Sequence, residues 1–407
     1  MRHKMWKRTP LPRRSVRRRD SQQWILDWIV KTTGRVQNFE RDERIVPAAA
    51  KSYRMAAKLL GEEADHQFAV GQEAEKNGYH RTALEMYWRA SLAYREGQHC
   101  IFEDDHPRKI SLHGRLLESY DKIMKFAEYP IERIEVPFQG KSLQGILHLL
   151  PDRRKAPCVI YVPGMDQTKE IYPDPLNNHF RHRGMHVLSI DGPGQGISNL
   201  RKIRVTDDNY ERAGKAFIDF LVKRPEVDAG KIGLFGISMG SFWAPRIAAY
   251  DHRVAAVAAA TACFGQKNWI FNESSPRFKQ IFMYMAGIQD EAKFDKMAEK
   301  MTLLGHGKKI RCPILLATGE FDPLCPVEDA YAVFDDMTGP KELWVWENEA
   351  HALNALKGAA GLDIHPLAAD WLRDKLEGRY DKKLAREVYI RQNGRGPYVD
   401  TTERSGR

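Results

Sequence analysis

The pentapeptide Gly236-Ile237-Ser238-Met239-Gly240 is the pattern in this sequence with the clearest chemical potential. A serine hydroxyl is a poor nucleophile unless a neighbouring base takes its proton. Glycines two residues on either side permit a sharp, strained turn that exposes the serine oxygen. The pentapeptide lies between the apolar run KIGLF and the helical stretch SFWAPRIAAY, which is the strand-turn-helix setting such a turn needs. We therefore expect Ser238 to be a nucleophile, against the alternative of a tight turn made from small residues.

Two residues that could activate Ser238 follow it in the order acid, then histidine. Asp322 lies in ATGEFDPLCP directly after the apolar run ILLA, and His351 lies in ENEAHALNAL shortly after ELWVW. A histidine can accept the serine proton, and an acid can hold the histidine in the required tautomer. We expect His351 to be the base and Asp322 its partner, with Glu320 and Asp329 as the other available acids.

An acyl-transfer site also needs hydrogen-bond donors for the developing oxyanion. The backbone N–H of Met239 is one candidate because that residue follows the nucleophile. The second donor should come from the loop after an early strand, where CVIYVPGMDQTKE offers Gly164 and Met165. We favour the Met165 amide, although PGM could be only a turn.

The run SIDGPGQGIS competes with this interpretation because glycines after a strand can surround a phosphate. It reads G-x-G-x-G from Gly192 to Gly196, contains Pro193, and leads into SNLRKIRV rather than into a helix. The dinucleotide fingerprint therefore fails in spacing and in context. We interpret the run as a structural loop at the mouth of the site and expect no cofactor.

Three histidines, His179, His182 and His186, are close enough in sequence to suggest a metal site. No acid or cysteine is convincingly placed to complete a ligand shell, and His186 begins an apolar run. We expect structural or surface histidines and no metal.

Seven apolar runs after Pro130 are predicted strands: SLQGILHLL, CVIYV, HVLSI, KIGLF, VAAVAAA, ILLA and ELWVW. Most are continuous rather than alternating, which is typical of a sheet buried on both faces. An amphipathic helix over DDNYERAGKAFIDFLVKR separates two of them. Strand and helix in alternation predict right-handed crossovers and a mostly parallel sheet.

The chain before Pro130 has a different periodicity of apolar residues. From about residue 20 to residue 128 it shows helical spacing, with Gly78 between two predicted antiparallel helices. The pattern resembles one tetratricopeptide repeat, but a single copy makes an accessory helical domain the simpler interpretation. We expect a basic tail over 1–19, this helical domain over 20–128, and a main domain over 129–378 with a C-terminal tail over 379–407.

A long helical insertion, about 264–309, separates VAAVAAA from ILLA and could form a lid that excludes water from the site. Six of its large side chains could form the core of the lid or a wall for an apolar or aromatic substrate: Trp269, Phe271, Phe278, Phe282, Met283 and Met285. Glu273, also in this segment, is a possible substrate contact.

The formal charge of +10 is concentrated at the two ends of the chain. The first 19 residues hold nine Lys and Arg and no acid, which leaves the body of the chain slightly acidic once both tails are removed. We therefore expect no nucleic-acid partner, although a transit peptide stays an alternative for the N-terminus. No apolar run approaches the roughly 18 residues of a membrane span, and five scattered cysteines indicate reduced thiols in a cytoplasmic protein.

Together these motifs resemble those of an α/β-hydrolase. More narrowly, the chain is similar to the group that includes dihydroxypseudooxynicotine hydrolase, the fermentation-respiration switch proteins and the fungal yellowish-green polyketide-shortening hydrolases. The similarity covers about residues 60–378 and rests on RASLAYREGQHCIFEDD, PGMDQTKE, DGPGQG, GISMGS, GEFDPLCP and EAHALNA in that order. Two departures are Ala350, where relatives usually have glycine or a polar residue, and the basic N-terminal tail.

The resemblance implies an α/β-hydrolase fold with a Ser238, Asp322 and His351 triad, closed by the helical domain. It also implies a homodimer and a small-molecule substrate whose carbon-carbon bond beside a ketone is hydrolysed, as in 1,3-dicarbonyl compounds. Ester hydrolysis is the alternative within this class. A non-catalytic interaction protein on the same scaffold is the alternative outside it.

Overall fold

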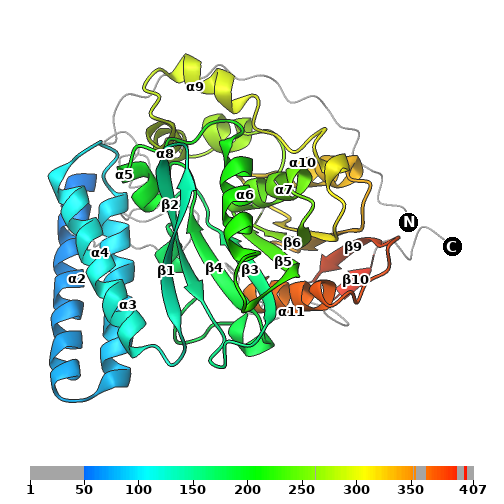
Figure 1. Cartoon of the computed structure of the whole chain (residues 1–407). Coiled ribbons are helices and arrows are strands. Elements are labelled where there is room, and N and C mark those ends of the chain that lie inside the picture. The colour runs from blue at the N-terminus through cyan, green and yellow to red at the C-terminus, as the bar shows by residue number, and fades with distance from the viewer. Residues whose placement is uncertain (1–49, 262, 352, 354–363, 392–397, 401–407) are drawn as a thin grey trace.

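The computed structural model describes residues 50–261, 263–351, 353, 364–391 and 398–400. Its centre is a ten-stranded sheet in the order β1-β2-β4-β3-β5-β6-β7-β8-β9-β10 (Figure 1). The strands are β1 (Ile131–Phe138), β2 (Lys141–His148), β3 (Ala156–Val162), β4 (His186–Asp191), β5 (Val227–Ile237), β6 (Val254–Ala260), β7 (Ile314–Gly319), β8 (Lys341–Trp346), β9 (Ala385–Ile390) and β10 (Tyr398–Asp400). Strands β4, β3 and β5 to β9 run parallel, while β1, β2 and β10 pair antiparallel. The predicted mostly parallel sheet and all seven predicted strands are confirmed.

Helices cover both faces of the sheet because most of its strands are apolar on both sides. In β5, Ile232 and Leu234 face a core that also contains side chains of α6, α7 and α10, whereas Phe235 and Ile237 face a second core with α11. The helices of the main domain are α5 (Gly196–Leu200), α6 (Asn209–Leu221), α7 (Gly240–Tyr250), α8 (Pro276–Ala286), α9 (Glu291–Ala298), α10 (Val327–Asp336) and α11 (Ile364–Leu376). Three short 3-10 helices and one π-helix join them: η1 (Lys169–Ile171), η2 (Arg181–Arg183), η4 (Gly307–Lys309) and the π-helix η3 (Trp269–Glu273).

Three long helices form the accessory region beside β1 and β2 (Figure 1): α2 (Tyr53–Lys76), α3 (His80–His99) and α4 (Pro107–Phe126). Gly78 separates α2 from α3 with a φ of 78°, as its position in the sequence predicted. The aromatic side chains Phe68, Tyr87 and Tyr120 fill the core of this bundle, and Ile146 of β2 packs into the same core. The helical region therefore packs against the end of the sheet formed by β1 and β2.

The prediction of a C-terminal tail from residue 379 was wrong for its described part, because β9 and β10 extend the sheet there. The run over β9, AREVYI, buries only Val388 and Ile390, with the charged Arg386 and Glu387 before Val388 and the half-buried Tyr389 between the two. This alternation is typical of a strand near a sheet edge, where one face meets water. A search for continuous apolar runs misses such a strand, and it missed β1 for the same reason.

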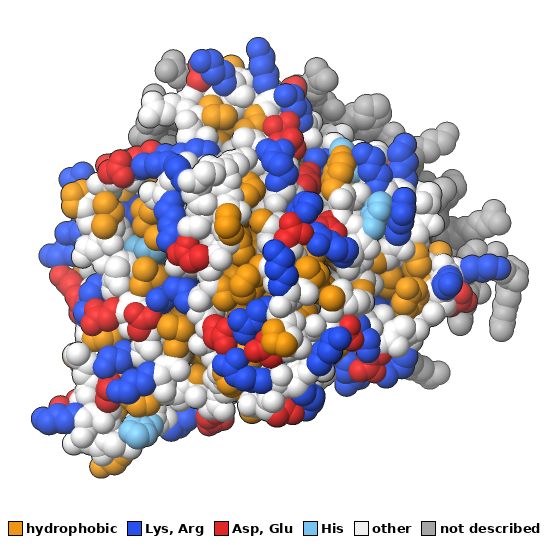
Figure 2. Space-filling view, viewed as in Figure 1, with side chains coloured by type: hydrophobic (Ala, Val, Ile, Leu, Met, Phe, Trp, Pro, Cys, Tyr) orange, Lys and Arg blue, Asp and Glu red, His pale blue; other side chains and the backbone are white. Residues whose placement is uncertain are grey.

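The described surface carries both signs of charge. In the face shown in Figure 2, Lys and Arg side chains are interspersed with Asp and Glu, with apolar atoms between them. The basic segment 1–19 lies outside the described residues. Among the described helices, none has the length and apolarity to cross a membrane.

Candidate active site

Ser238 occupies the sharp turn between β5 and α7. Its φ of 54° lies in the left-handed region, which a residue with a side chain adopts at a cost of about 1–3 kcal/mol. A β-carbon on Gly236 would come 2.2 Å from the Gly240 carbonyl oxygen, and one on Gly240 would come 1.9 Å from the Val162 carbonyl oxygen. Both glycines are therefore required by close backbone contacts, and the turn lifts the half-buried Ser238 above the end of the sheet.

Thr261 supports this turn from the neighbouring strand. It directly follows β6, and its Oγ1 accepts a hydrogen bond of 2.7 Å from the Ser238 backbone N–H. The Thr261 φ of 60° shows that its own backbone is held in an uncommon conformation. Thr261 is not among the predicted site residues; the signal that could indicate it is a hydroxyl directly after the strand that pairs with β5.

His351 bridges Ser238 and Asp322. Its Nε2 lies 2.9 Å from the Ser238 Oγ, and its Nδ1 lies 2.8 Å from the Asp322 Oδ2. The other Asp322 oxygen accepts backbone N–H groups from Leu324 at 2.8 Å and Cys325 at 3.3 Å. An ionised carboxylate only accepts hydrogen bonds, so Nδ1 carries the proton and Nε2 keeps a lone pair facing the hydroxyl. His351 and Asp322 are 6% and 3% exposed, which strengthens these contacts by excluding water.

The other two acids near this position have different partners. Glu320 accepts the Asn348 backbone N–H at 3.0 Å. Asp329 accepts the Gly265 backbone N–H at 2.8 Å, and burial raises the pKa of its carboxyl. Of the three candidate acids, Asp322 is therefore the one whose carboxylate meets the histidine.

Two buried backbone N–H groups beside the serine have no hydrogen-bond acceptor among the described residues: those of Met165 and Met239. A buried N–H without a partner is rare in folded proteins because its desolvation is costly. Gly164 lies so close to the nucleophile that a β-carbon on it would come 3.1 Å from the Ser238 Cβ. Both predicted oxyanion donors are thus next to the serine and available.

The loop that carries Gly164 and Met165 is held by several parts of the chain. Within the loop, the Gln167 Oε1 accepts the Gly164 N–H at 3.0 Å. From α3, Arg95 donates to the Asp166 carbonyl oxygen at 3.2 Å, and from α8, Arg277 forms an ion pair of 3.3 Å with the Asp166 carboxylate. The helical region and the insertion therefore both reach this loop, and the sequence indicated neither contact.

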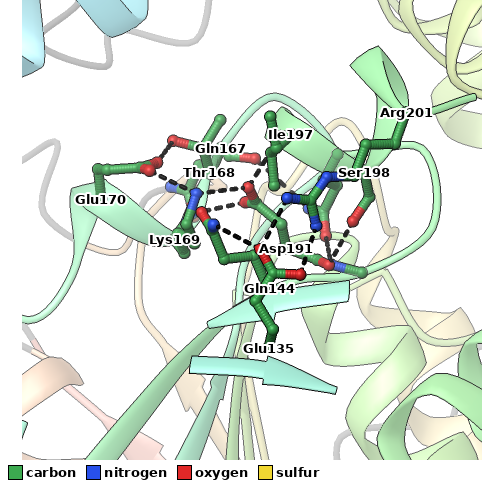
Figure 3. Close-up of polar contacts among 12 residues, drawn as sticks. Glu135, Gln144, Gln167, Thr168, Lys169, Glu170, Asp191, Ile197, Ser198 and Arg201 are labelled. Carbon is green, nitrogen blue, oxygen red and sulfur yellow. Dashed lines mark hydrogen bonds and ion pairs between the residues drawn. The ribbon is translucent and has the colours of Figure 1, made fainter. Parts of the chain in front are cut away.

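A buried ionic cluster anchors the far end of the same loop (Figure 3). The Lys169 ammonium lies 2.9 Å from the Asp191 Oδ2 and 2.5 Å from the Glu170 Oε1, and all three side chains are fully buried. Asp191 also accepts the backbone N–H groups of Lys169 and Ile197. Burial opposes the charge on Lys169, but Asp191 and Glu170 outweigh burial and raise the pKa of the ammonium above its usual value.

The glycine run after β4 is a closed structural loop. Its Gly194 N–H donates to the Ile203 carbonyl and its Gln195 N–H to the Gly192 carbonyl, so these donors are not available to a phosphate. The expectation that no helix follows was wrong, since the short helix α5 begins at Gly196. The Asp191 carboxylate lies where a β-carbon on Gly196 would be, which explains that glycine and blocks the start of the helix to an anion.

The remaining sequence candidates take up other positions. His186 begins β4 as predicted, and its Nδ1 accepts the Leu150 N–H at 3.0 Å. No group of metal-binding side chains occurs within the described ranges. Glu273 is half-buried at the end of η3, and its contact with a substrate stays a prediction. Of the six insertion side chains, four pack in the main core and Trp269 and Met283 are half-buried; the four are Phe271, Phe278, Phe282 and Met285.

A mostly parallel sheet flanked by helices, with serine, aspartate and histidine on the loops after β5, β7 and β8, defines the α/β-hydrolase class. The chain belongs to the family described as Esterase FrsA-like, whose model matches residues 64–376. The predicted family and fold are confirmed, and the protein is a hydrolase.

Individual relatives agree with this assignment. Hydrolase LUC6 from Fusarium sp is 28% identical over 373 residues, which are 79% of this chain and 88% of that protein. The 2,6-dihydropseudooxynicotine hydrolase of Paenarthrobacter nicotinovorans is 27% identical over 313 residues, 75% of this chain and 81% of that protein. A crystal structure of a 2,6-dihydroxy-pseudo-oxynicotine hydrolase shares the fold, with a TM-score of 0.69 and 24% identity over 82% of this chain and 91% of its own.

Proposed function

We propose that this hydrolase cleaves a carbonyl substrate through a covalent acyl intermediate on Ser238. The observation that carries the proposal is the position of His351, with Nε2 2.9 Å from the serine hydroxyl and Nδ1 2.8 Å from Asp322. These distances are within hydrogen-bond reach, as a general base requires. The tautomer set by Asp322 leaves the lone pair on the nitrogen that faces the serine.

The reaction begins when His351 Nε2 takes the Ser238 proton and the serine oxygen attacks the substrate carbonyl carbon. The negative charge that develops on the carbonyl oxygen is stabilised by the N–H groups of Met165 and Met239. Asp322 stabilises the imidazolium that forms. The tetrahedral intermediate then collapses to an acyl-serine and releases the leaving group, which takes the proton from His351.

We propose carbon-carbon bond cleavage as the reaction. In a 1,3-dicarbonyl substrate the leaving carbanion is stabilised by the second carbonyl and is protonated on carbon by His351. Water, deprotonated by the same histidine, hydrolyses the acyl-serine, so the products are one carboxylic acid and one ketone. The resemblance to carbon-carbon hydrolases and the relative named 2,6-dihydropseudooxynicotine hydrolase support this choice. Glu273 is proposed as an additional contact to the substrate.

Ester hydrolysis is the second candidate, supported by the family description Esterase FrsA-like. The steps on Ser238 are the same, and the only difference is that an alkoxide leaves and is protonated on oxygen. The insertion and the helical region both contact the loop of Met165. A substrate with apolar or aromatic parts stays a prediction, because four of the six large side chains of the insertion pack in the main core.

A paired substrate screen tests the proposal. Wild type, Ser238→Ala and Ser91→Ala are incubated with activated esters and with 1,3-diketones, and acid and ketone products are quantified. Ser91 is a buried serine of α3 whose hydroxyl bonds to the Trp88 carbonyl, so it is a matched control. We expect diketone cleavage by wild type and by Ser91→Ala, and none by Ser238→Ala.

Two other results would change the assignment. Ester turnover without diketone cleavage would replace the carbon-carbon reaction with the esterase reaction. Turnover that survives in Ser238→Ala, or a failure of a fluorophosphonate probe to label Ser238 under conditions that label a control esterase, would remove Ser238 from its role.

A further inference from the structure

Gln195 is a buried residue of the DGPGQG loop that contacts the oxyanion loop directly. Its side chain is 2% exposed, and its Nε2 donates a hydrogen bond of 2.7 Å to the Gly164 carbonyl oxygen. At the other end of the amide, the Oε1 accepts the Gly192 N–H at 3.2 Å and the Tyr210 hydroxyl. The hydrogen bonds that join Ser238, His351 and Asp322 do not involve this glutamine.

The amide of Gln195 has only one orientation that satisfies its neighbours. Carbonyl oxygens of Pro163 and Gly164 surround one end and require a donor there. The Gly192 N–H lies at the other end and requires an acceptor. The side-chain NH₂ therefore faces the oxyanion loop, and its direction does not depend on how the two amide atoms are assigned.

The peptide bond between Gly164 and Met165 links the Gln195 contact to the Met165 N–H, the proposed oxyanion donor. A peptide unit is planar and trans, so its C=O and N–H point in opposite directions. The Gly164 carbonyl oxygen accepts hydrogen bonds from the Gln195 Nε2 and from the Gln167 backbone N–H at 3.1 Å, so these two bonds together turn the Met165 N–H away from Gln195. That N–H has no acceptor among the residues that the structure describes, and Gly164 borders the Ser238 side chain.

Tyr210, which donates to the Gln195 Oε1, packs against α7, the helix that follows the nucleophile. Tyr210 stacks on Trp243 of α7 with ring centroids 4.1 Å apart and an angle of 5°. The backbone N–H of Trp243 donates to the Met239 carbonyl in the first turn of that helix. Gly192 leaves room for this arrangement, since a β-carbon on it would come 2.2 Å from the Tyr210 ring.

We propose that Gln195 is a positioning residue that orients the Met165 N–H toward the oxyanion formed on a substrate bound at Ser238. The proposal rests on the proposed function, because the oxyanion exists only if Ser238 attacks a carbonyl. Gln195 touches neither the substrate nor the reacting atoms. It acts by holding the peptide that carries one donor, and Tyr210 holds the glutamine relative to the helix that carries the other.

The experiment compares Gln195→Glu and Gln195→Met with Gln144→Met. Gln144 of β2 is also buried, but its amide bonds to the Glu135 side chain and not to the oxyanion loop. Kinetics on the best substrate of the screen give kcat and KM, and thermal melting shows that each variant is folded. A trifluoromethyl ketone, which forms an oxyanion with the serine, serves as the transition-state probe.

We expect kcat to fall by about 10²-fold in both Gln195 variants while KM changes less than about threefold, because an oxyanion contact is made only in the transition state. Affinity for the trifluoromethyl ketone should fall by a similar factor. Gln144→Met should keep its kcat. Tyr210→Phe, which keeps the Gly192 contact of Gln195, should lose about two- to tenfold in kcat.

A kcat in folded Gln195 variants within twofold of Gln144→Met would overturn the proposal, as would a loss confined to KM. If neither Gln195 variant folds, Tyr210→Phe decides, and an unchanged kcat and ketone affinity there would overturn it. Failure of the proposed function has a different signature, since wild type would then lack turnover or Ser238→Ala would retain it.

Discussion

Two buried polar clusters lie at the ends of parallel strands. Each is built on an aspartate that accepts backbone N–H groups, but the two aspartates have partners of different chemistry. In one, Asp191 at the end of β4 accepts the backbone N–H groups of Lys169 and Ile197. In the other, Asp322 after β7 accepts those of Leu324 and Cys325. These hydrogen bonds fix each aspartate in place, so that its other contacts are made to the side chain of a basic residue.

The partner of each aspartate makes the difference. Asp191 meets the Lys169 ammonium, which has three donors and no lone pair, and the cluster is sealed by Glu170. Asp322 meets His351, whose second nitrogen keeps a lone pair and faces the half-buried Ser238. A buried acid with a lysine partner thus supports structure, whereas the histidine partner of Asp322 supports the proton exchange that we propose.

The largest effect should come from removing the proton acceptor. In His351→Ala we expect kcat to fall by about 10⁴-fold or more, because Ser238 then has no base. The free energy of unfolding should also fall, because the buried Asp322 loses its imidazole partner, so kcat is compared per folded molecule. Steady-state kinetics together with thermal melting provide the measurement, and a loss of less than tenfold would contradict the assignment of His351 as base.

The next effect tests the tautomer. In Asp322→Asn the amide NH₂ can face Nδ1 of His351, which moves the ring proton to Nε2 and removes the acceptor for the serine. We expect kcat to fall by about 10³- to 10⁴-fold at unchanged stability. Asp329→Asn is the matched control, because that acid bonds to backbone N–H groups of the insertion instead. Equal losses in the two variants would contradict the specific role of Asp322.

The two clusters also differ in how far the sequence could predict them. Asp322 and His351 each follow an apolar strand run, and the order serine, acid, histidine is a local pattern that the fold places at one edge of the sheet. Lys169 and Asp191 are 22 residues apart and belong to no such pattern. A lysine is also usually exposed, so composition argues against burying it.

The supporting contacts of the site were hidden for similar reasons. The sequence indicates Gln195 only as part of a glycine-rich loop, because the role proposed for it depends on the direction of a peptide bond 31 residues away. Arg95 contacts the Asp166 carbonyl across 71 residues, which no local spacing indicates. Strands that are continuous apolar runs were predictable, whereas the alternating strands β1 and β9 were not. Local order is readable from sequence, and long-range polar pairing is decided by packing.

The substitution Lys169→Met removes the cation from the buried cluster of Lys169, Glu170 and Asp191. This change leaves Asp191 and Glu170 buried without their cation, so we expect the free energy of unfolding to fall by about 3–5 kcal/mol. The kcat per folded molecule should change less than tenfold, in contrast to His351→Ala. Lys215→Met breaks an exposed pair with Asp219 and should cost at most about 0.5 kcal/mol. Chemical denaturation measures both, and similar small effects would show that the cluster does not stabilise the fold.

The last prediction concerns the pH dependence of stability caused by His113 of α4, whose pKa is affected by Lys169 of the same cluster. Burial, followed by the charge of Lys169, lowers the pKa of His113 to about 4 from its usual 6.5. The unfolded chain therefore binds this proton first as the pH falls, so the free energy of unfolding decreases between pH 6.5 and about pH 4. The full effect is about 3 kcal/mol, present as stability above pH 6.5 and lost below pH 4.

His113→Leu removes this titration, and His66→Leu, which replaces an exposed histidine of α2, is its control. Denaturation at a series of pH values should show the wild-type curve falling relative to His113→Leu across that window while the His66→Leu curve follows wild type. Parallel curves for wild type and His113→Leu would mean that the imidazole is not held neutral. The expected difference between the wild-type and His113→Leu curves would separate the two clusters once more. A neutral histidine near Lys169 is a passive part of the packing, whereas the role proposed for His351 requires it to gain and lose its proton in every turnover.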